Sequence, residues 1–174
     1  MTRGDVERFE RVVLPHLDDA YTLARYLLRD EHDAQDVVQE ASLRAFRYFG
    51  GFSGGDARAW LLAIVRNCSL NWRRRHRANE QMVSFIDGID VPVDTDHEAD
   101  ASSIESSERA RVHRAIDALP PEFREVIVLR EVQELSYKEI SDVSGVPIGT
   151  VMSRLARARR RLAVLLGVDA REAS

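Results

Sequence analysis

The segment Leu135–Leu162 constrains the fold more than any other part of this chain, because it contains signals for two successive helices and the turn between them. Ser136 and Glu139 have the S-x-x-E spacing of a capping box, which predicts the start of a short helix. Gly145 falls where that helix has to turn, and glycine adopts a positive φ there without strain. Pro147 suits the first turn of the next helix, where no N–H donor is needed. The spacing therefore predicts a helix-turn-helix, its first helix running to Val143.

The second of these helices is predicted to be apolar on one side and basic on the others. Its apolar stripe consists of Val151, Leu155, Leu162, Leu165 and Leu166. Its other sides carry Ser153, Arg154, Arg157, Arg159, Arg160 and Arg161. Such a helix fits the DNA major groove, where its first side chains contact base edges and later arginines contact phosphates. A solvated helical hairpin is the alternative, but the cap, the turn glycine and the basic surface together favour DNA binding.

The bulk composition indicates one medium domain or two small ones. The chain has 174 residues, of which 44% are hydrophobic and 31% are charged. No apolar run approaches a membrane-spanning length and the first residues lack a signal-peptide core, so we expect a cytoplasmic protein. Cys68 is the single cysteine, so an internal disulfide is excluded. Because it lies in an apolar helical stretch, we expect it to be a small packing residue.

The net charge of −4 is unevenly distributed along the chain. Residues 81–108 contain eight acidic and no basic side chains, so the chain without them would carry +4. Positive charge concentrates in residues 66–77 and 154–161. The location of charge, and not its total, bears on nucleic-acid partners.

The chain is predicted to be all-α, since no strand pattern of period two occurs anywhere. We expect a long helix over residues 5–29, a second capped by Asp33 or a neighbour, and a third from Asp56. Further helices are expected near residues 107–118 and over 123–132, separated by the Pro120-Pro121 break. The predicted domain boundaries are 1–80 for a first helical domain, 81–106 for a flexible acidic linker, 107–168 for a second helical domain and 169–174 for a tail.

Three features of the first domain are candidates for function. Asp36, Gln39 and Glu40 share one face of the second helix, whose packing positions are expected to include Leu43. Taken alone, such a charged face is more often simply solvated than a partner site. A loop with four glycines, residues 49–56, allows close backbone approach to a ligand, although an ordinary interhelical turn explains it equally well. The third helix carries basic residues beside Trp72, which suits DNA, while Trp60 is expected in the core and Trp72 fits either place.

Catalysis is not expected, because the sequence offers no carboxylate pair, His/Cys cluster or Ser/His set. No cofactor or metal site is predicted.

In this order, the segments resemble the extracytoplasmic-function sigma factors, the small promoter-recognition subunits of bacterial RNA polymerase. The resemblance covers about residues 5–80 and 107–166. It is carried by DAQDVVQEASLRAF, AWLLAIVRNCSLNWRRR, LPPEFREVIVLREVQELSYKEIS and GVPIGTVMSRLARARRRL. The chain departs from the usual pattern at Met152, where a basic residue is common, at Ala156, where a larger one is common, and at Ser141.

The resemblance implies a sigma region 2, a sigma region 4 with the helix-turn-helix, and a linker passing through the polymerase. Implied to dock on core RNA polymerase are Asp36, Gln39, Glu40 and Arg44. Implied at the −10 element, with a flipped single-stranded base in the loop, are Phe52, Ser53, Asp56, Asn67, Trp72, Arg73, Arg74 and Arg77. Implied at the double-stranded −35 element are Ser153 and Arg157 on bases, with Thr150, Arg154, Arg160 and Arg161 on phosphates. An anti-sigma factor is a further implied partner.

Two rivals stay open at this point. A helix-turn-helix repressor or activator would bind operator DNA as a dimer without polymerase. A sigma-mimicking decoy would bind an anti-sigma factor, although the intact basic clusters argue against it. A nucleic-acid enzyme ranks last, since no residues for it are present.

Overall fold

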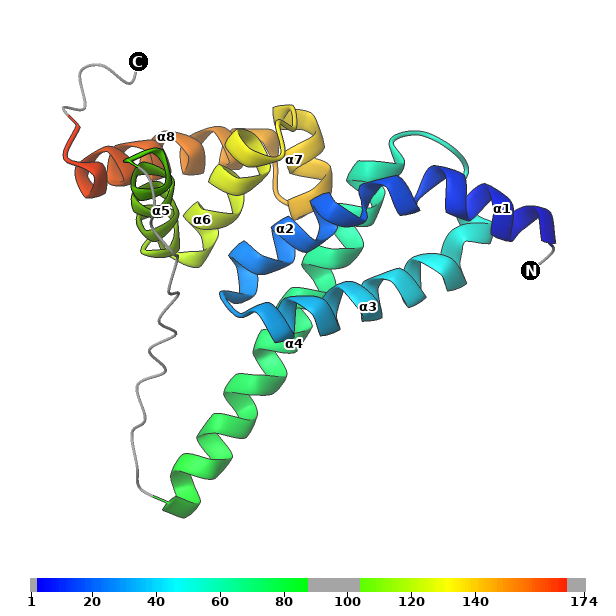
Figure 1. The fold of residues 1–174 in the computed structure, drawn as a ribbon, viewed down its shortest axis with the longest axis horizontal. Helices are drawn as coiled ribbons and strands as arrows, with labels where there is room; N and C mark the ends of the chain where they lie inside the picture. Colours follow the sequence, from blue (N-terminus) through cyan, green and yellow to red (C-terminus); the bar gives the residue numbers. More distant parts are fainter. Residues whose placement is uncertain (1–2, 88–103, 169–174) are drawn as a thin grey trace. The chain divides into compact units, whose positions relative to one another are not determined.

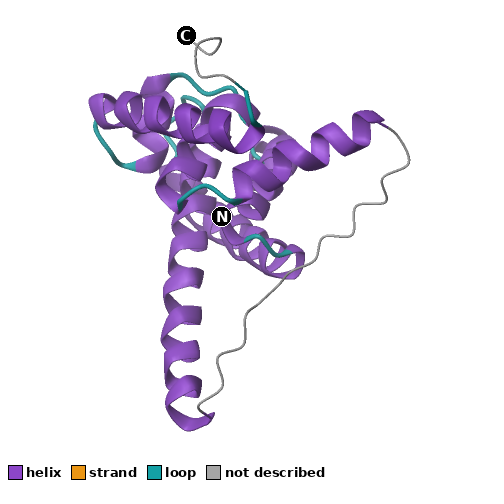
Figure 2. Cartoon of the chain, turned by 90° about the vertical axis from the view of Figure 1, so that its left-hand side faces the viewer, coloured by secondary structure: helices purple, strands orange, loops and turns teal. Residues whose placement is uncertain are grey.

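The computed structural model describes residues 3–87 and 104–168, and every regular element in these stretches is a helix (Figure 1, Figure 2). The prediction of an all-α fold is confirmed. The chain divides into two compact units, Met1–Thr95 and Asp96–Ser174. Among the described residues, no helix combines the length and the apolar character that crossing a membrane requires.

The first unit is built around three helices that pack on one another, α2, α3 and α4. Its elements in chain order are α1 (Arg3–Val12), the 3₁₀ turn η1 (Leu14–His16), α2 (Leu17–Leu28), α3 (Glu31–Tyr48), the 3₁₀ turn η2 (Phe49–Gly51) and α4 (Ala57–Asp87). Small residues on α3 face this core, namely Ala34, Val37, Ala41 and Ala45. Because these side chains are small, the neighbouring helices approach α3 closely.

The prediction of one continuous helix over residues 5–29 is wrong. Pro15 has no N–H to donate, and its ring clashes with the backbone one turn earlier in a continuing helix. The chain instead leaves α1 after Val12, makes the turn η1 and starts again as α2. Val13 lies at the break and is fully buried, so the bend is packed into the core of the unit.

Helix α4 is longer than predicted. The sequence favours a helix that ends near the basic cluster, yet α4 continues to Asp87, inside the segment 81–106 that was predicted as a linker. The next helix begins at Ile104, a little earlier than expected. The remainder of the predicted linker, residues 88–103, lies outside the described residues.

In the second unit, three helices pack against α8. The elements are α5 (Ile104–Asp117), α6 (Pro121–Ile127), the π-helical segment η3 (Val128–Val132), α7 (Tyr137–Ser144) and α8 (Ile148–Leu166). Side chains that are fully or almost fully buried hold them together, among them Leu119, Ile127, Leu129, Leu135, Ile140, Val151 and Leu155.

The break between α5 and α6 forms where the two prolines predict it. Pro121 occupies the first turn of α6. The buried Arg124 side chain reaches back from α6, and its Nη2 donates to the carbonyl oxygens of Asp117 at 2.8 Å and Leu119 at 2.9 Å. These bonds satisfy one carbonyl at the end of α5 and one in the break that follows it, where helical partners are lacking.

Candidate functional site

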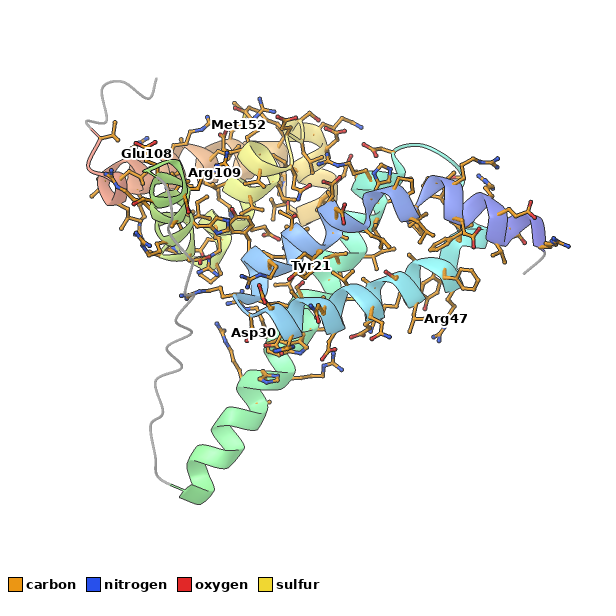
Figure 3. The ribbon with its side chains drawn as sticks, in the orientation of Figure 1. Tyr21, Asp30, Arg47, Glu108, Arg109 and Met152 are labelled. Carbon is orange, nitrogen blue, oxygen red and sulfur yellow. The ribbon has the colours of Figure 1, made fainter. Side chains whose placement is uncertain are left out.

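Helix α3 presents a polar stripe on the side opposite its small core residues. Asp30 caps its start, its Oδ1 accepting a hydrogen bond from the Asp33 N–H at 2.9 Å, so the cap is a neighbour of Asp33. Residues spaced by three or four positions then share the solvent side, namely Asp36, Gln39, Glu40, Leu43 and Arg47. Figure 3 shows Asp30 at the beginning of α3 and Arg47 near its end.

The expectation that Leu43 packs in the core is wrong, since 63% of this residue is exposed. The spacing along the helix predicts this exposure: Leu43 follows Asp36 by seven residues and Glu40 by three, which places it on the polar side of α3. A single exposed leucine is common on protein surfaces, so Leu43 does not by itself mark a binding site. Sequence reasoning missed this residue because an apolar side chain was assigned to the core by type.

Glu40 joins the polar stripe of α3 to the basic cluster of α4. Its Oε1 accepts a hydrogen bond from Arg44 Nη2 at 2.5 Å, and its Oε2 accepts one from Arg75 Nη2 at 3.3 Å. All three side chains keep substantial exposure, 32% for Glu40, 41% for Arg44 and 63% for Arg75. Because solvent screens such pairs, they orient the side chains more than they stabilise the fold.

The start of α3 concentrates negative charge. Partial burial, with repulsion from Asp30 and Asp36, raises the pKa of the Asp33 carboxyl above its usual value, while His76 and His32 oppose the rise. Deeper in the unit, burial raises the pKa of the Cys68 thiol. Cys68 is fully buried, as expected for a small packing residue.

The loop from η2 to α4 brings aromatic rings together. Phe52 is half-buried and its ring centroid lies 5.8 Å from that of Phe49, stacked, and 5.0 Å from that of Trp60, tilted. Gly54 and Gly55 both adopt positive φ, near +100°, which glycine tolerates and other residues rarely do. The loop therefore has a fixed aromatic base, and the exposed Ser53 lies between this base and the glycines.

Asp56 ends the loop by capping α4. Its Oδ1 accepts hydrogen bonds from the N–H groups of Arg58 at 2.9 Å and Ala59 at 3.1 Å. The Arg58 side chain in turn donates to Asp19 of α2 at 2.6 Å, which ties the beginning of α4 to the neighbouring helix. Asp56 thus has a structural role that holds whether or not it also contacts DNA.

The basic cluster lies on α4 beyond the residues that pack in the core. Every side chain from Arg74 to Ala78 is exposed, while Arg73 is half-buried. Trp72 is half-buried and stacks on His76, with ring centroids 3.8 Å apart. One turn and more before it, Asn67 is exposed. The described geometry thus gives α4 an exposed cationic surface with one stacked aromatic pair.

The helix-turn-helix forms as predicted in the second unit. Ser136 Oγ accepts from the Glu139 N–H at 3.2 Å, and Glu139 Oε2 accepts from the Ser136 N–H at 2.7 Å, which is a complete capping box. Gly145 has φ +70° and ends α7. Ser141 adds a bond across the turn, its hydroxyl donating to the Val146 carbonyl at 2.6 Å. Pro147 stands immediately before α8, one position earlier than predicted.

Helix α8 has a buried side and a basic solvent side. Val151, Leu155 and Ala158 are buried, while Leu165, which was expected in the same stripe, is 48% exposed. On the opposite side lie the exposed residues Met152, Ser153, Ala156, Arg157 and Arg160. Met152 projects from the ribbon in Figure 3.

The remaining predicted −35 residues flank that solvent side. Thr150 and Arg154 are half-buried. Ser153 Oγ donates to the Thr150 carbonyl at 3.1 Å, a local bond that DNA would have to compete with. Arg161 is exposed, and its guanidinium lies 5.4 Å from the centre of the Phe123 ring, a cation–π distance.

Family models match both units. Sigma-70 region 2 matches residues 12–79, and Sigma-70 region 4 matches residues 109–162. The fold and its two surfaces therefore define a sigma-70-type factor with a region 2 unit and a region 4 unit.

Individual relatives narrow the class. The chain is 36% identical over 182 residues to the RNA polymerase sigma-H factor of Pseudomonas aeruginosa, covering 98% of this chain and 92% of that protein. It is 36% identical over 154 residues to the ECF RNA polymerase sigma factor SigE of Mycolicibacterium smegmatis, covering 88% of this chain and 60% of that protein. The chain belongs to the extracytoplasmic-function sigma factors. It is not an enzyme, and it directs RNA polymerase to promoters.

Solved structures agree with this assignment. The sigma factor RpoE in complex with the anti-sigma factor NepR from Bartonella quintana matches with a TM-score of 0.76 and 29% identity, over 94% of this chain and 99% of that chain. CnrH in complex with the cytosolic domain of CnrY matches with a TM-score of 0.65 and 28% identity, over 93% and 89%.

Proposed function

We propose that α8 reads the −35 element and that its solvent side divides into base and phosphate contacts. Ser153 and Arg157 contact base edges, while Thr150, Arg154, Arg160 and Arg161 contact phosphates. The observation that carries this assignment is the one-sided exposure of α8, because Ser153, Arg157 and Arg160 lie opposite the buried Val151 and Leu155. A recognition helix in the major groove needs such a side, polar and cationic along several turns.

In the first unit, α3 docks on core RNA polymerase through Asp36, Gln39, Glu40 and Arg44. Its stripe is continuous and mixed in charge, with Asp36 and Gln39 exposed and Glu40 and Arg44 half-buried, and the exposed Leu43 lies in the middle of it. Interfaces of this kind combine an apolar contact with a charged rim.

The −10 element is captured next to this docking stripe. A base flipped from the non-template strand enters the loop at Phe52, Ser53 and Asp56, and the strand continues along Asn67, Trp72, Arg73, Arg74 and Arg77. The aromatic cluster under the loop and the exposed cationic end of α4 support this path, since unstacked bases bind aromatic faces and phosphates bind arginines. Binding the open strand in preference to the duplex favours melting without any chemistry from this chain.

The proposed partners extend to an anti-sigma factor, and the proposed compartment is the cytoplasm, where RNA polymerase works. Both RpoE and CnrH, which this chain resembles over more than nine-tenths of its length, were solved in complexes with such proteins or their cytosolic domains. The proposed domain boundaries are residues 1–80 for region 2, 81–106 for the acidic linker and 107–168 for region 4.

Reconstitution with sigma-free core polymerase tests these assignments. Run-off transcription is scored on a promoter library in which the −35 and −10 positions vary independently. We expect transcripts that depend on this chain, a −35 preference that Arg157→Ala relaxes, and a −10 preference that Phe52→Ala changes. An unchanged −35 preference in Arg157→Ala contradicts the α8 assignment. Operator-like DNA binding without polymerase would favour a repressor, and binding to an anti-sigma factor alone would favour a decoy.

A further inference from the structure

Arg159 differs from the other arginines of α8 in where it points. Along a helix each residue turns by about 100°, so Arg159 lies well away from Arg157 and Arg160 around the axis. Its Nη2 and Nε both donate to Glu131 Oε1, at 2.7 and 3.1 Å. The hydrogen bond with Glu131 raises the pKa of the Arg159 guanidinium, and the nearby Tyr137 side chain adds to this rise while partial burial opposes it. Arg159 is therefore engaged with the protein on the flank of α8.

The partner of Arg159 belongs to the segment that connects α6 to the helix-turn-helix. Glu131 lies in η3, and this segment leads to Tyr137, the first residue of α7. The neighbouring Arg130 strengthens the same connection: its Nη1 donates to the Leu135 carbonyl at 2.8 Å, and its guanidinium lies 5.2 Å from the Tyr137 ring centre.

The connection itself is unusual in its backbone. The π-helical η3 is followed by a hydrogen bond from the Gln133 N–H to the Val128 carbonyl at 2.9 Å, and Glu134 adopts a left-handed φ of +56°. A non-glycine residue holds that conformation only where surrounding contacts impose it. The bonds of Arg159 and Arg130 supply such contacts, one to each side of the left-handed residue.

We propose that Arg159 is a positioning residue for −35 recognition: through Glu131 it sets the orientation of α8, and it does not contact DNA phosphate. The proposal rests on the assignment of α8 to the −35 element. It divides the arginine run of α8 by role, with Arg157 and Arg160 facing DNA and Arg159 facing the connection between η3 and α7.

The two possible roles of Arg159 predict opposite effects of removing Glu131. If Arg159 contacts phosphate, Glu131 competes with DNA for the guanidinium, and Glu131→Ala strengthens −35 binding by freeing a cation and removing a negative charge. If Arg159 positions α8, Glu131→Ala weakens binding although it makes the surface more positive. General electrostatics cannot give the second result, because removal of an acidic side chain near DNA favours association.

The experiment measures binding of −35 promoter duplex by the holoenzyme, assembled from full-length chain and core polymerase, across a range of salt concentrations. Variants are Arg159→Ala, Glu131→Ala, the double variant, Arg157→Ala as a base-contact reference, Arg160→Ala as a phosphate-contact reference, and Glu108→Ala. Glu108 is exposed on α5 of the same unit and serves as the matched loss of one negative charge (Figure 3).

We expect Arg159→Ala and Glu131→Ala each to weaken binding about three- to tenfold, as is usual for coupled contacts, with the double variant no weaker than either. The slope of log affinity against log salt should stay at the wild-type value in Arg159→Ala and fall by about one in Arg160→Ala. Glu108→Ala should leave affinity unchanged or slightly higher.

Tighter binding by Glu131→Ala, or a reduced salt slope in Arg159→Ala, would overturn the positioning role. Failure of the α8 assignment has a separate signature, since Arg157→Ala and Arg160→Ala would then leave −35 binding unchanged. Thermal unfolding of each variant checks that weakened binding is not loss of fold. The pair is partly exposed, 39% for Arg159 and 48% for Glu131, so only a small change in melting temperature is expected.

Discussion

Replacing Glu40 by Lys separates polymerase docking from folding. The substitution removes the pairs with Arg44 and Arg75, each worth about 0.2–1 kcal/mol for groups this exposed. It also places a lysine four residues before Arg44, a like-charge repulsion of about 0.2–0.5 kcal/mol. The first unit should therefore lose about 0.6–2.5 kcal/mol and remain folded at 25 °C. Core-polymerase affinity should fall by about tenfold or more, because the charge at one central position of the proposed docking stripe is reversed.

Asp36→Lys is the matched control for stability. Asp36 lies on the same stripe one turn earlier, is exposed, and contributes to the repulsion that raises the pKa of the Asp33 carboxyl. A lysine there relieves that repulsion, so docking should weaken without loss of stability. Both tryptophans of the chain, Trp60 and Trp72, lie in the first unit, so their fluorescence reports its unfolding alone.

Core-polymerase affinity is measured by competition with a labelled reference sigma factor, in parallel with tryptophan-detected melting. If α3 is the docking helix, both variants lose affinity and only Glu40→Lys melts earlier. The reasoning is refuted if Asp36→Lys binds like wild type while Glu40→Lys binds weakly, because the loss of affinity then follows the loss of stability.

Three further perturbations test separate parts of the argument. Arg157→Ala should relax −35 base preference in a promoter-variant panel and leave −10 preference unchanged, and an altered −10 preference would argue against a local role. Gly145→Ala should destabilise the helix-turn-helix by about 1–2 kcal/mol, measured by amide hydrogen exchange. The cost comes from the φ of +70°, since an added methyl group meets no atom within 4 Å. Gly149→Ala lies inside α8 and should cause no such loss. The pKa of Asp33 is raised in the folded state, so ionisation of this carboxyl destabilises the fold as pH rises through that pKa. Asp33→Asn should therefore raise the melting temperature at pH 7. This gain should vanish below about pH 3.8, where the aspartate is protonated in both the folded and the unfolded state. An equal gain at both pH values would place its cause elsewhere.

The parts of the fold that were predictable from the sequence depend on interactions close along the chain. Ser136 and Glu139 specify a helix start with their own side chains, and Gly145 specifies its end by its backbone freedom. Pro121 likewise begins α6 where the two prolines predict a restart. Each of these signals acts over four residues or fewer, so no knowledge of tertiary packing is needed to read it.

The wrong predictions concern helix continuity and side-chain burial, which depend on tertiary packing. The predicted helix over residues 5–29 contains Pro15, but the chain breaks there and buries Val13 at the bend. Leu43 and Leu165 were assigned to apolar stripes by type, yet both are exposed. Whether a leucine is buried depends on which side of its helix meets a neighbour, and that is set by contacts distant in sequence.

The roles of the α8 arginines could likewise not be predicted from the sequence alone. Their composition predicts a single basic surface, but Arg159 is paired with Glu131, 28 residues earlier, and only the fold reveals that pairing. The exposed basic side of α8 also explains how a chain with net charge −4 can bind DNA. At physiological salt, an exposed charge acts over only about 8 Å. A DNA phosphate at Arg157 or Arg160 is therefore attracted by the basic side of α8. Acidic side chains of segment 81–108 that lie more than this distance from the phosphate hardly affect it. The attraction is then short in range. If α3 docks on polymerase as proposed, docking supplies the high effective concentration of promoter that −35 binding by so local a surface requires.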